Sequence, residues 1–185
     1  MNKTMVIDKN KALKKAVMII IAVTSAVVLP QIFHAIGVIS GTGAATGAAF
    51  LPMHIPVLLA GLLYGPIVGV TAGILSPIIS FAVSGMPTSA LLPYMVIELA
   101  VYGLTAGLLS KSKLPSIIKL LIVQISGRVA RGGAVLFAIY ALDNSKLTVA
   151  SISSFVTAGL FGIALQWAVI PLMLYRLNNT GKPNE

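Results

Sequence analysis

Apolar segments long enough to cross a bilayer follow one another along most of this chain. Only 9% of the residues are charged and 57% are hydrophobic, whereas a soluble domain carries roughly a quarter charged residues. So few charges cannot cover a water-facing surface, which excludes a soluble domain, and the high hydrophobic content excludes a disordered chain. At roughly 20 residues per span, 185 residues leave room for about six transmembrane helices. The sequence therefore predicts an all-α membrane bundle.

Turns and uncharged loops divide the apolar sequence into six predicted spans. Gly65-Pro66 is typical of the end of one helix and the start of the next, and uncharged loops cover residues 37–49 and 84–93. The predicted spans are residues 16–36, 50–65, 66–83, 94–109, 117–142 and 151–174. A re-entrant hairpin over residues 50–83 is the alternative to two full spans.

The basic residues predict the orientation of the bundle. The chain has 13 Lys and Arg against 4 Asp and Glu, and nearly all the basic residues lie in residues 1–15, 111–119 and 176–185. Because Lys and Arg favour cytoplasmic loops, both termini are expected in the cytoplasm. In sequence, residues 1–15 and 176–185 flank a single membrane domain over residues 16–175. No basic run is interleaved with aromatic residues on a polar face, so we expect no nucleic-acid partner.

Three charged residues are predicted deep in the bilayer, namely Glu98, Arg128 and Arg131. Even on insertion scales each Arg costs about 2.5–3.5 kcal/mol at a helix centre, so their presence needs a cause. Arg128 and Arg131 are three residues apart and project from similar faces of one helix. One interpretation is an internal ion pair between Glu98 and one Arg. The other Arg would then suit a bound anion, for instance a carboxylate.

Three further polar or aromatic residues are candidates for the same site. Gln166 and Trp167 lie mid-span. Their position has two interpretations, namely contacts between helices or the wall of a pocket. His54 lies in the rigid segment 52–56 at the predicted outer mouth, where a capping or interface role is expected. Since no H-E-x-x-H pattern occurs and no carboxylate is near in sequence, neither His54 nor His34 predicts a metal site.

Small residues recur at a spacing of four. They are Gly61, Gly65, Gly69 and Gly73, followed by Gly103 and Gly107. On helices this spacing lets backbones approach closely, so we expect these glycines to pack helices together. Ala22 and Ala26 form a further pair on the first span. There, docking of a partner is an alternative to packing within the chain.

Signatures of an enzyme are missing from the sequence. No G-x-S-x-G occurs, the glycine-rich residues 41–47 precede no phosphate-binding Lys, and cysteine is absent. We therefore expect no catalytic residues, no metal and no cofactor. Active transport would need energy from a partner or an ion gradient. An intramembrane enzyme and a non-transport structural protein are the alternative classes.

Two runs in the central third of the chain carry a resemblance to a known family. The first covers residues 50–73 (FLPMHIPVLLAGLLYGPIVGVTAG). The second includes Gly85-Met86-Pro87, Ile97-Glu98-Leu99 and Tyr102-Gly103. Both resemble the substrate-binding S components of energy-coupling factor (ECF) transporters. Residues 22–26 are similar to the Ala-xxx-Ala docking motif of that family.

The resemblance implies a multi-pass protein of the bacterial plasma membrane that captures a small water-soluble vitamin from outside. It also implies docking on a membrane-embedded coupling subunit, with two cytoplasmic ATPase subunits supplying the energy. In the family, spans 4 to 6 and the outer loops form the vitamin pocket. The candidates on those spans here are Glu98, Arg128, Arg131, Gln166 and Trp167.

The segments Pro-Met-His-Ile-Pro and Gly-Met-Pro are most similar to the subgroup that includes pantothenate and hydroxymethylpyrimidine transporters. An arginine pair suits the carboxylate of pantothenate, whereas Glu98 suits a ring-nitrogen donor such as hydroxymethylpyrimidine or pyridoxine. The sequence leaves this choice open, and we favour pantothenate as the hypothesis.

Overall fold

The computed structural model describes residues 3–43, 49–144 and 148–179. Over these ranges it contains seven helices and no strand, which confirms the all-α class. The helices are α1 (Lys3–Ile39), α3 (His54–Tyr64), α4 (Pro66–Ser84), α5 (Leu92–Leu108), α6 (Ser116–Tyr140), α7 (Val149–Ala158) and α8 (Leu160–Asn179).

Four of the described helices are long and apolar enough to cross a membrane, which identifies the chain as a membrane protein. These spans are Lys9–Ile39 within α1, α4, α6, and Leu160–Leu177 within α8. The shorter apolar helices α3 and α5 have 11 and 17 residues. At 1.5 Å per residue α3 is only about 16 Å long, about half the hydrocarbon thickness.

The structure differs from the predicted boundaries at both ends of the chain. α1 begins at Lys3, so the basic N-terminal segment continues the first span as one helix of 37 residues. The predicted span 151–174 is instead divided at Gly159 into α7 and α8. A Cβ at Gly159 would lie 2.6 Å from Nη2 of Arg128 and 2.9 Å from Cδ1 of Leu51, so this junction needs glycine to approach them.

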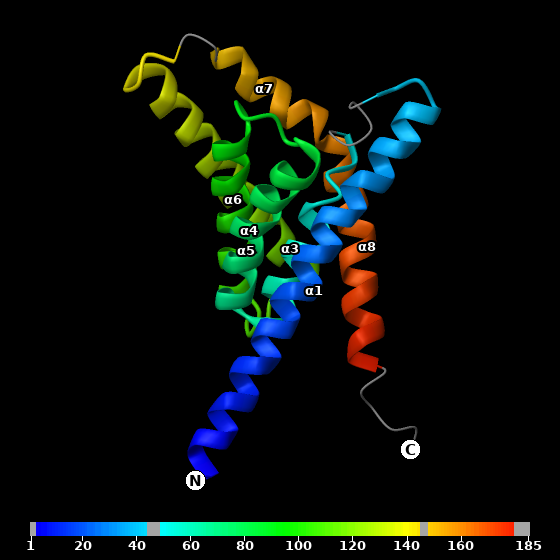
Figure 1. Cartoon of the computed structure of the whole chain (residues 1–185), viewed down its shortest axis with the longest axis vertical. Helices are drawn as coiled ribbons and strands as arrows, with labels where there is room; N and C mark the ends of the chain where they lie inside the picture. Colours follow the sequence, from blue (N-terminus) through cyan, green and yellow to red (C-terminus); the bar gives the residue numbers. More distant parts are fainter. Residues whose placement is uncertain (1–2, 44–48, 145–147, 180–185) are drawn as a thin grey trace.

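The helices give the molecule two distinct ends. The start of α1 and the end of α8 both point toward the lower end in Figure 1, whereas α7 and the connection from α4 to α5 lie at the upper end. The exposed basic residues of the described chain gather mainly toward the lower end. They include Lys9, Lys11, Lys14, Lys15, Lys111, Lys113 and Arg176.

Close packing of α4 on α5 forms the rigid centre of the bundle. A Cβ on Gly103 would collide with the carbonyl oxygen of Gly69, and one on Gly73 would collide with the carbonyl oxygen of Leu99. The predicted packing role therefore holds for five of the six glycines, and Gly65 is the exception: it ends α3 with a φ of 90°, and a Cβ there would meet nothing within 4 Å. The contact between α4 and α5 fixes the face of α5 that carries Glu98.

Replacing Gly103 by alanine tests this packing. We expect Gly103→Ala to lower the free energy of unfolding by about 1–3 kcal/mol, because the added methyl group forces two backbones apart. Gly133→Ala on α6 is the matched control, since its Cβ would meet nothing within 4 Å. Thermal unfolding in detergent micelles measures both. Equal unfolding temperatures for the two variants would contradict the close contact.

Candidate functional site

A buried cluster of charged side chains lies between α3, α5 and α6. Glu98 of α5 is fully buried and lies at the centre. Nη1 of Arg131 donates a hydrogen bond to Oε2 of Glu98 at 2.6 Å, and Nε of Arg128 lies 3.3 Å from Oε1. Nε2 of His54 is 3.9 Å from Oε2. The structure thus brings together four of the residues that the sequence singled out.

Helical spacing and one glycine place these groups against each other. Glu98 and Tyr102 are four residues apart on the buried face of α5. A Cβ at Gly127 of α6 would collide with the ring of Tyr102, so glycine lets α6 come close here. His54 packs edge-on to Tyr102, with ring centroids 5.3 Å apart. The next residue after Gly127 is Arg128, which is thereby held beside Glu98.

Among the side chains that the structure describes, the cluster has more positive than negative groups. Two guanidinium groups face one carboxylate, and the side chains of Arg128 and Arg131 are only 12% and 11% exposed. The only other acidic side chain described, Asp143, is exposed beyond the end of α6. A charge shielded from water is costly unless it is paired. The fork of donors on Arg suits a carboxylate, so the cluster is suited to bind an anion.

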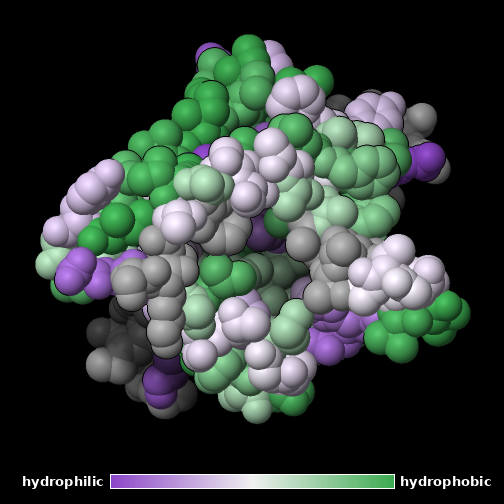
Figure 2. Space-filling model, turned by 90° about the horizontal axis from the view of Figure 1, so that it is seen from above, coloured by the Kyte–Doolittle hydropathy of each residue, from purple (hydrophilic) through white to green (hydrophobic). Residues whose placement is uncertain are grey.

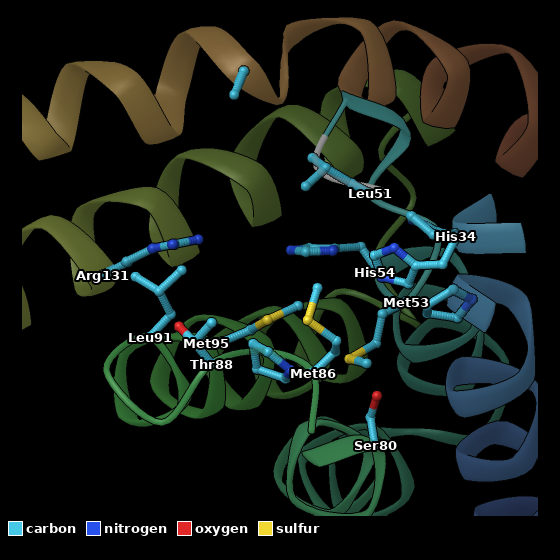
Figure 3. Close-up of a pocket in the computed structure, with 14 residues that line it drawn as sticks. His34, Leu51, Met53, His54, Ser80, Met86, Thr88, Leu91, Met95 and Arg131 are labelled. Atoms are coloured by element: carbon cyan, nitrogen blue, oxygen red, sulfur yellow. The ribbon is translucent and has the colours of Figure 1, made fainter. Parts of the chain in front are cut away.

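A cavity of about 360 Å³ adjoins this cluster. From above, Figure 2 shows a hollow near the middle of this face, and both hydrophilic and hydrophobic residues are visible inside it. In Figure 3 Arg131 reaches from α6 toward the side where Met53, Met86 and Met95 gather. The volume lies within the range of about 300–1,000 Å³ that is typical of small-molecule sites.

The walls of the cavity are mostly apolar with a few polar groups. Arg131 and His54 belong both to the wall and to the charged cluster, and Glu98 and Arg128 are not on the wall. The other lining residues are Pro30, His34, Leu51, Pro52, Met53, Ser80, Met86, Pro87, Thr88, Leu91, Met95 and Ala158. This mixture of apolar wall and few polar groups is the usual composition of a binding site for a small organic molecule.

Comparison with known proteins identifies the family. The sequence profile described as ECF transporter, substrate-specific component, matches residues 16–175. The chain belongs to this family. No curated protein matches it, and no solved structure matches it. Members of the family are substrate-binding subunits of transporters rather than enzymes, and they act with a membrane-embedded coupling subunit and ATPases.

Gln166 and Trp167 of this S component lie in a second polar cluster between α6 and α8. Nε2 of Gln124 donates to Oε1 of Gln166 at 2.9 Å, and Nε1 of Trp167 donates to Oε1 of Gln124 at 2.7 Å. Gln166 is fully buried, whereas Trp167 is 38% exposed. Neither is among the described residues that line the large cavity, and their hydrogen bonds join them to Gln124 rather than to Glu98. Their role in substrate binding stays a prediction.

Replacing Gln124 by leucine tests what this second cluster does. Gln124→Leu leaves Oε1 of Gln166 and Nε1 of Trp167 without their partner, so we expect the free energy of unfolding to fall by about 1–3 kcal/mol. Trp167 is the only tryptophan in the chain, and its fluorescence reports the change directly. Unchanged stability with a large loss of substrate affinity would instead indicate that the cluster contacts substrate.

Ala22 and Ala26 lie on the inner face of α1. Ala22 is 8% exposed and packs with Ala60 and Val68, and Ala26 is fully buried beside Val57. In this conformation the two alanines join α1 to α3 and α4. A docking surface built from them would require α1 to separate from those helices.

Several residues of the cavity wall were not singled out from the sequence. The three methionines, Leu51 and Thr88 lie in apolar or loop segments whose composition is typical of any membrane helix or turn. The available signal was the pair of short motifs Pro-Met-His-Ile-Pro and Gly-Met-Pro, which supply Met53, His54 and Met86. Both motifs meet at the cavity.

Proposed function

We propose that this S component is the high-affinity binding subunit for a small water-soluble vitamin that carries a carboxylate, with pantothenate preferred. One observation supports this most strongly: Arg131 belongs both to a cluster with excess positive charge and to the wall of a ligand-sized cavity. A substrate carboxylate at Arg131 would neutralise that charge.

The position of Glu98 favours pantothenate over hydroxymethylpyrimidine or pyridoxine. Recognition of a ring-nitrogen donor needs a carboxylate that faces the ligand. Both oxygens of Glu98 face guanidinium groups, and Glu98 is not on the cavity wall. An anionic ligand could bind Arg131 while Glu98 keeps its contacts with both arginines. A ring-nitrogen donor would bind only if Glu98 turned away from them toward the cavity.

The rest of the cavity wall also suits pantothenate. Its gem-dimethyl group would contact the methionine and proline side chains, because thioether groups pack adaptably against irregular apolar shapes. Its hydroxyl and amide groups would reach Ser80, Thr88 or His34 on the same wall. The mechanism is binding alone, with shape and charge complementarity in place of any chemical step.

For the topology, we propose six membrane crossings, made by α1, α3, α4, α5, α6 and the pair α7 and α8. Both termini would lie in the cytoplasm of a bacterial cell, because the exposed Lys residues gather at that end. The hollowed face of Figure 2 would then open outward. This arrangement suits capture from outside and energy supplied by two cytoplasmic ATPases through a coupling subunit.

Docking of that coupling subunit on Ala22 and Ala26 is a further part of the proposal, which requires movement of α1. Cross-linking tests it in the complete transporter, with Ala22→Cys paired against cysteines in the coupling subunit. A cross-link that forms during turnover supports the proposal. Cross-links only from the exposed face of α1, for example from Val28→Cys, would assign docking to that face.

Calorimetric binding to the purified chain tests the substrate. We expect nanomolar binding of pantothenate without ATP. Pantothenol, in which an alcohol replaces the carboxylate, should bind at least about 100-fold more weakly, since a charge-assisted contact is lost. Tighter binding of hydroxymethylpyrimidine or pyridoxine would overturn the choice of substrate. No saturable binding across a vitamin panel would overturn the function.

A further inference from the structure

Three serines lie four residues apart on α4, and their hydroxyl groups differ in what they bond. Oγ of Ser76 donates to the carbonyl oxygen of Ala72 at 2.6 Å, and Oγ of Ser84 donates to the carbonyl oxygen of Ser80 at 2.8 Å. A serine inside a helix usually either faces solvent or bonds the carbonyl one turn back. Ser80 does neither, because it is only 1% exposed and its hydroxyl has no hydrogen-bond partner among the described residues.

A buried hydroxyl without a partner destabilises the folded state. Burial removes the water that would bond it, and no described residue of the fold replaces that hydrogen bond. The great majority of buried polar groups in folded proteins are paired, so this exception needs a cause. The hydroxyl either turns to the carbonyl oxygen of Ser76, as its two neighbours on α4 do one turn back, or receives a partner from outside the fold.

The position of Ser80 favours a partner from outside the fold. Ser80 belongs to the wall of the large cavity, whereas Ser76 and Ser84 are not among the described residues that line it. In Figure 3 the oxygen of Ser80 points toward the side where Met53 and Met86 lie. Because Ser80 is almost fully buried, a ligand group reaches its hydroxyl when these flexible thioether side chains move aside.

Ser80 and Arg131 mark two separate parts of the cavity wall. They come from α4 and α6, which both pack on α5. In Figure 3 the methionine side chains lie between Arg131 and Ser80. A ligand that contacts both residues therefore carries its charged group at one end and a hydrogen-bonding group at the other.

We propose that Ser80 is a specificity-determining residue that hydrogen-bonds to an uncharged hydroxyl group of the ligand. This inference rests on the proposed function, and in pantothenate the hydroxyl is the terminal one, at the opposite end of the molecule from the carboxylate. The gem-dimethyl group is attached next to that end, so its contact with Met53 and Met86 brings the terminal hydroxyl toward Ser80. Each of the two hydroxyl groups can donate and accept, so they satisfy one another without any charge.

Two matched serine variants test the contact. Ser80→Ala and Ser76→Ala each remove one buried hydroxyl from α4 by the same change. We expect Ser80→Ala to weaken pantothenate binding by roughly five- to tenfold, which is the usual effect of one neutral hydrogen bond, and Ser76→Ala to bind like the wild type. Isothermal titration calorimetry of the full chain in detergent measures both. Equal affinities of the wild type and Ser80→Ala would overturn the proposal.

The ligand-free protein gives a second readout. Ser80→Ala removes a hydroxyl that has no partner in the described fold, so we expect its unfolding temperature to equal or exceed that of the wild type. Thermal unfolding without ligand measures this. A fall of several degrees would show that the hydroxyl bonds within the fold, for instance to the carbonyl oxygen of Ser76, and would overturn the proposal.

A pantothenate analogue with hydrogen in place of the terminal hydroxyl tests the same contact from the side of the ligand. The wild type should bind this analogue roughly five- to tenfold more weakly than pantothenate, and Ser80→Ala should bind it as the wild type does. Full affinity of the wild type for the analogue would overturn the proposal even if Ser80→Ala failed to fold.

A different vitamin separates this inference from the choice of substrate. If the wild type binds hydroxymethylpyrimidine or pyridoxine in place of pantothenate, the proposed substrate is wrong, and Ser80→Ala is titrated with the vitamin that binds. A five- to tenfold loss then supports the role of Ser80, and an unchanged affinity overturns it.

Discussion

Replacing Arg131 by glutamine is expected to weaken pantothenate binding by the purified S component by roughly 30- to 4,000-fold. This range corresponds to about 2–5 kcal/mol, the usual cost of truncating one partner of a buried, hydrogen-bonded charge pair. Among the described residues that line the large cavity, Arg131 is the only Arg, Lys, Asp or Glu, and its side chain is 11% exposed. Isothermal titration calorimetry measures the change.

Two comparisons show whether the loss arises at the carboxylate. Lys113→Gln changes an exposed residue in the connection from α5 to α6 and should bind pantothenate like the wild type. Arg131→Gln and wild type should bind pantothenol with similar affinity, because that ligand lacks the charged group. If Arg131→Gln loses affinity for both ligands equally, Arg131 supports the fold of the cavity and does not contact the carboxylate.

Replacing Glu98 by leucine is expected to destabilise the protein by about 3–5 kcal/mol. The substitution removes the only carboxylate of the cluster and leaves two guanidinium groups facing each other in buried surroundings. Breaking a buried ion pair on one side costs this much because the remaining charge has no partner. Thermal unfolding in detergent, together with the yield of folded protein, measures the effect.

A triple variant distinguishes electrostatics from packing. Glu98→Leu combined with Arg128→Met and Arg131→Met removes every charge of the cluster while keeping similar volumes. We expect most of the lost stability to return, because replacing a complete buried ion cluster by apolar residues is often neutral or stabilising. Pantothenate binding should stay abolished. A triple variant as unstable as Glu98→Leu would mean that the shape of Glu98, and not its charge, matters.

Features of the fold that depend on local sequence could be predicted. The apolar segments show the membrane class, and Gly65-Pro66 marks the boundary between α3 and α4, where Gly65 has a φ of 90°. The break at Gly159 could not be predicted, because it depends on the approach of Arg128 from α6 and of Leu51 from the segment before α3. The extension of α1 to Lys3 was also missed. Residues 3–15 are mostly polar and lack the apolar pattern from which a membrane helix is predicted.

The charged cluster was predictable in its members but not in its pairing. The cost of ionised groups in hydrocarbon indicated that Glu98, Arg128 and Arg131 belong together. The sequence suggested one ion pair, whereas both arginines face Glu98 and His54 lies close by. The inward position of Ala22 and the pairing of Gln166 with Gln124 depend on helix rotation, which a single sequence does not determine.

An experimental structure of the S component with pantothenate bound tests the central claim most directly, which is that an outward-opening cavity captures an anion at Arg131. We expect the ligand in the large cavity, with its carboxylate within hydrogen-bond distance of the Arg131 guanidinium and its gem-dimethyl group beside Met53 and Met86. A ligand bound beside Gln166 and Trp167, with the large cavity empty or filled by lipid, would contradict the claim.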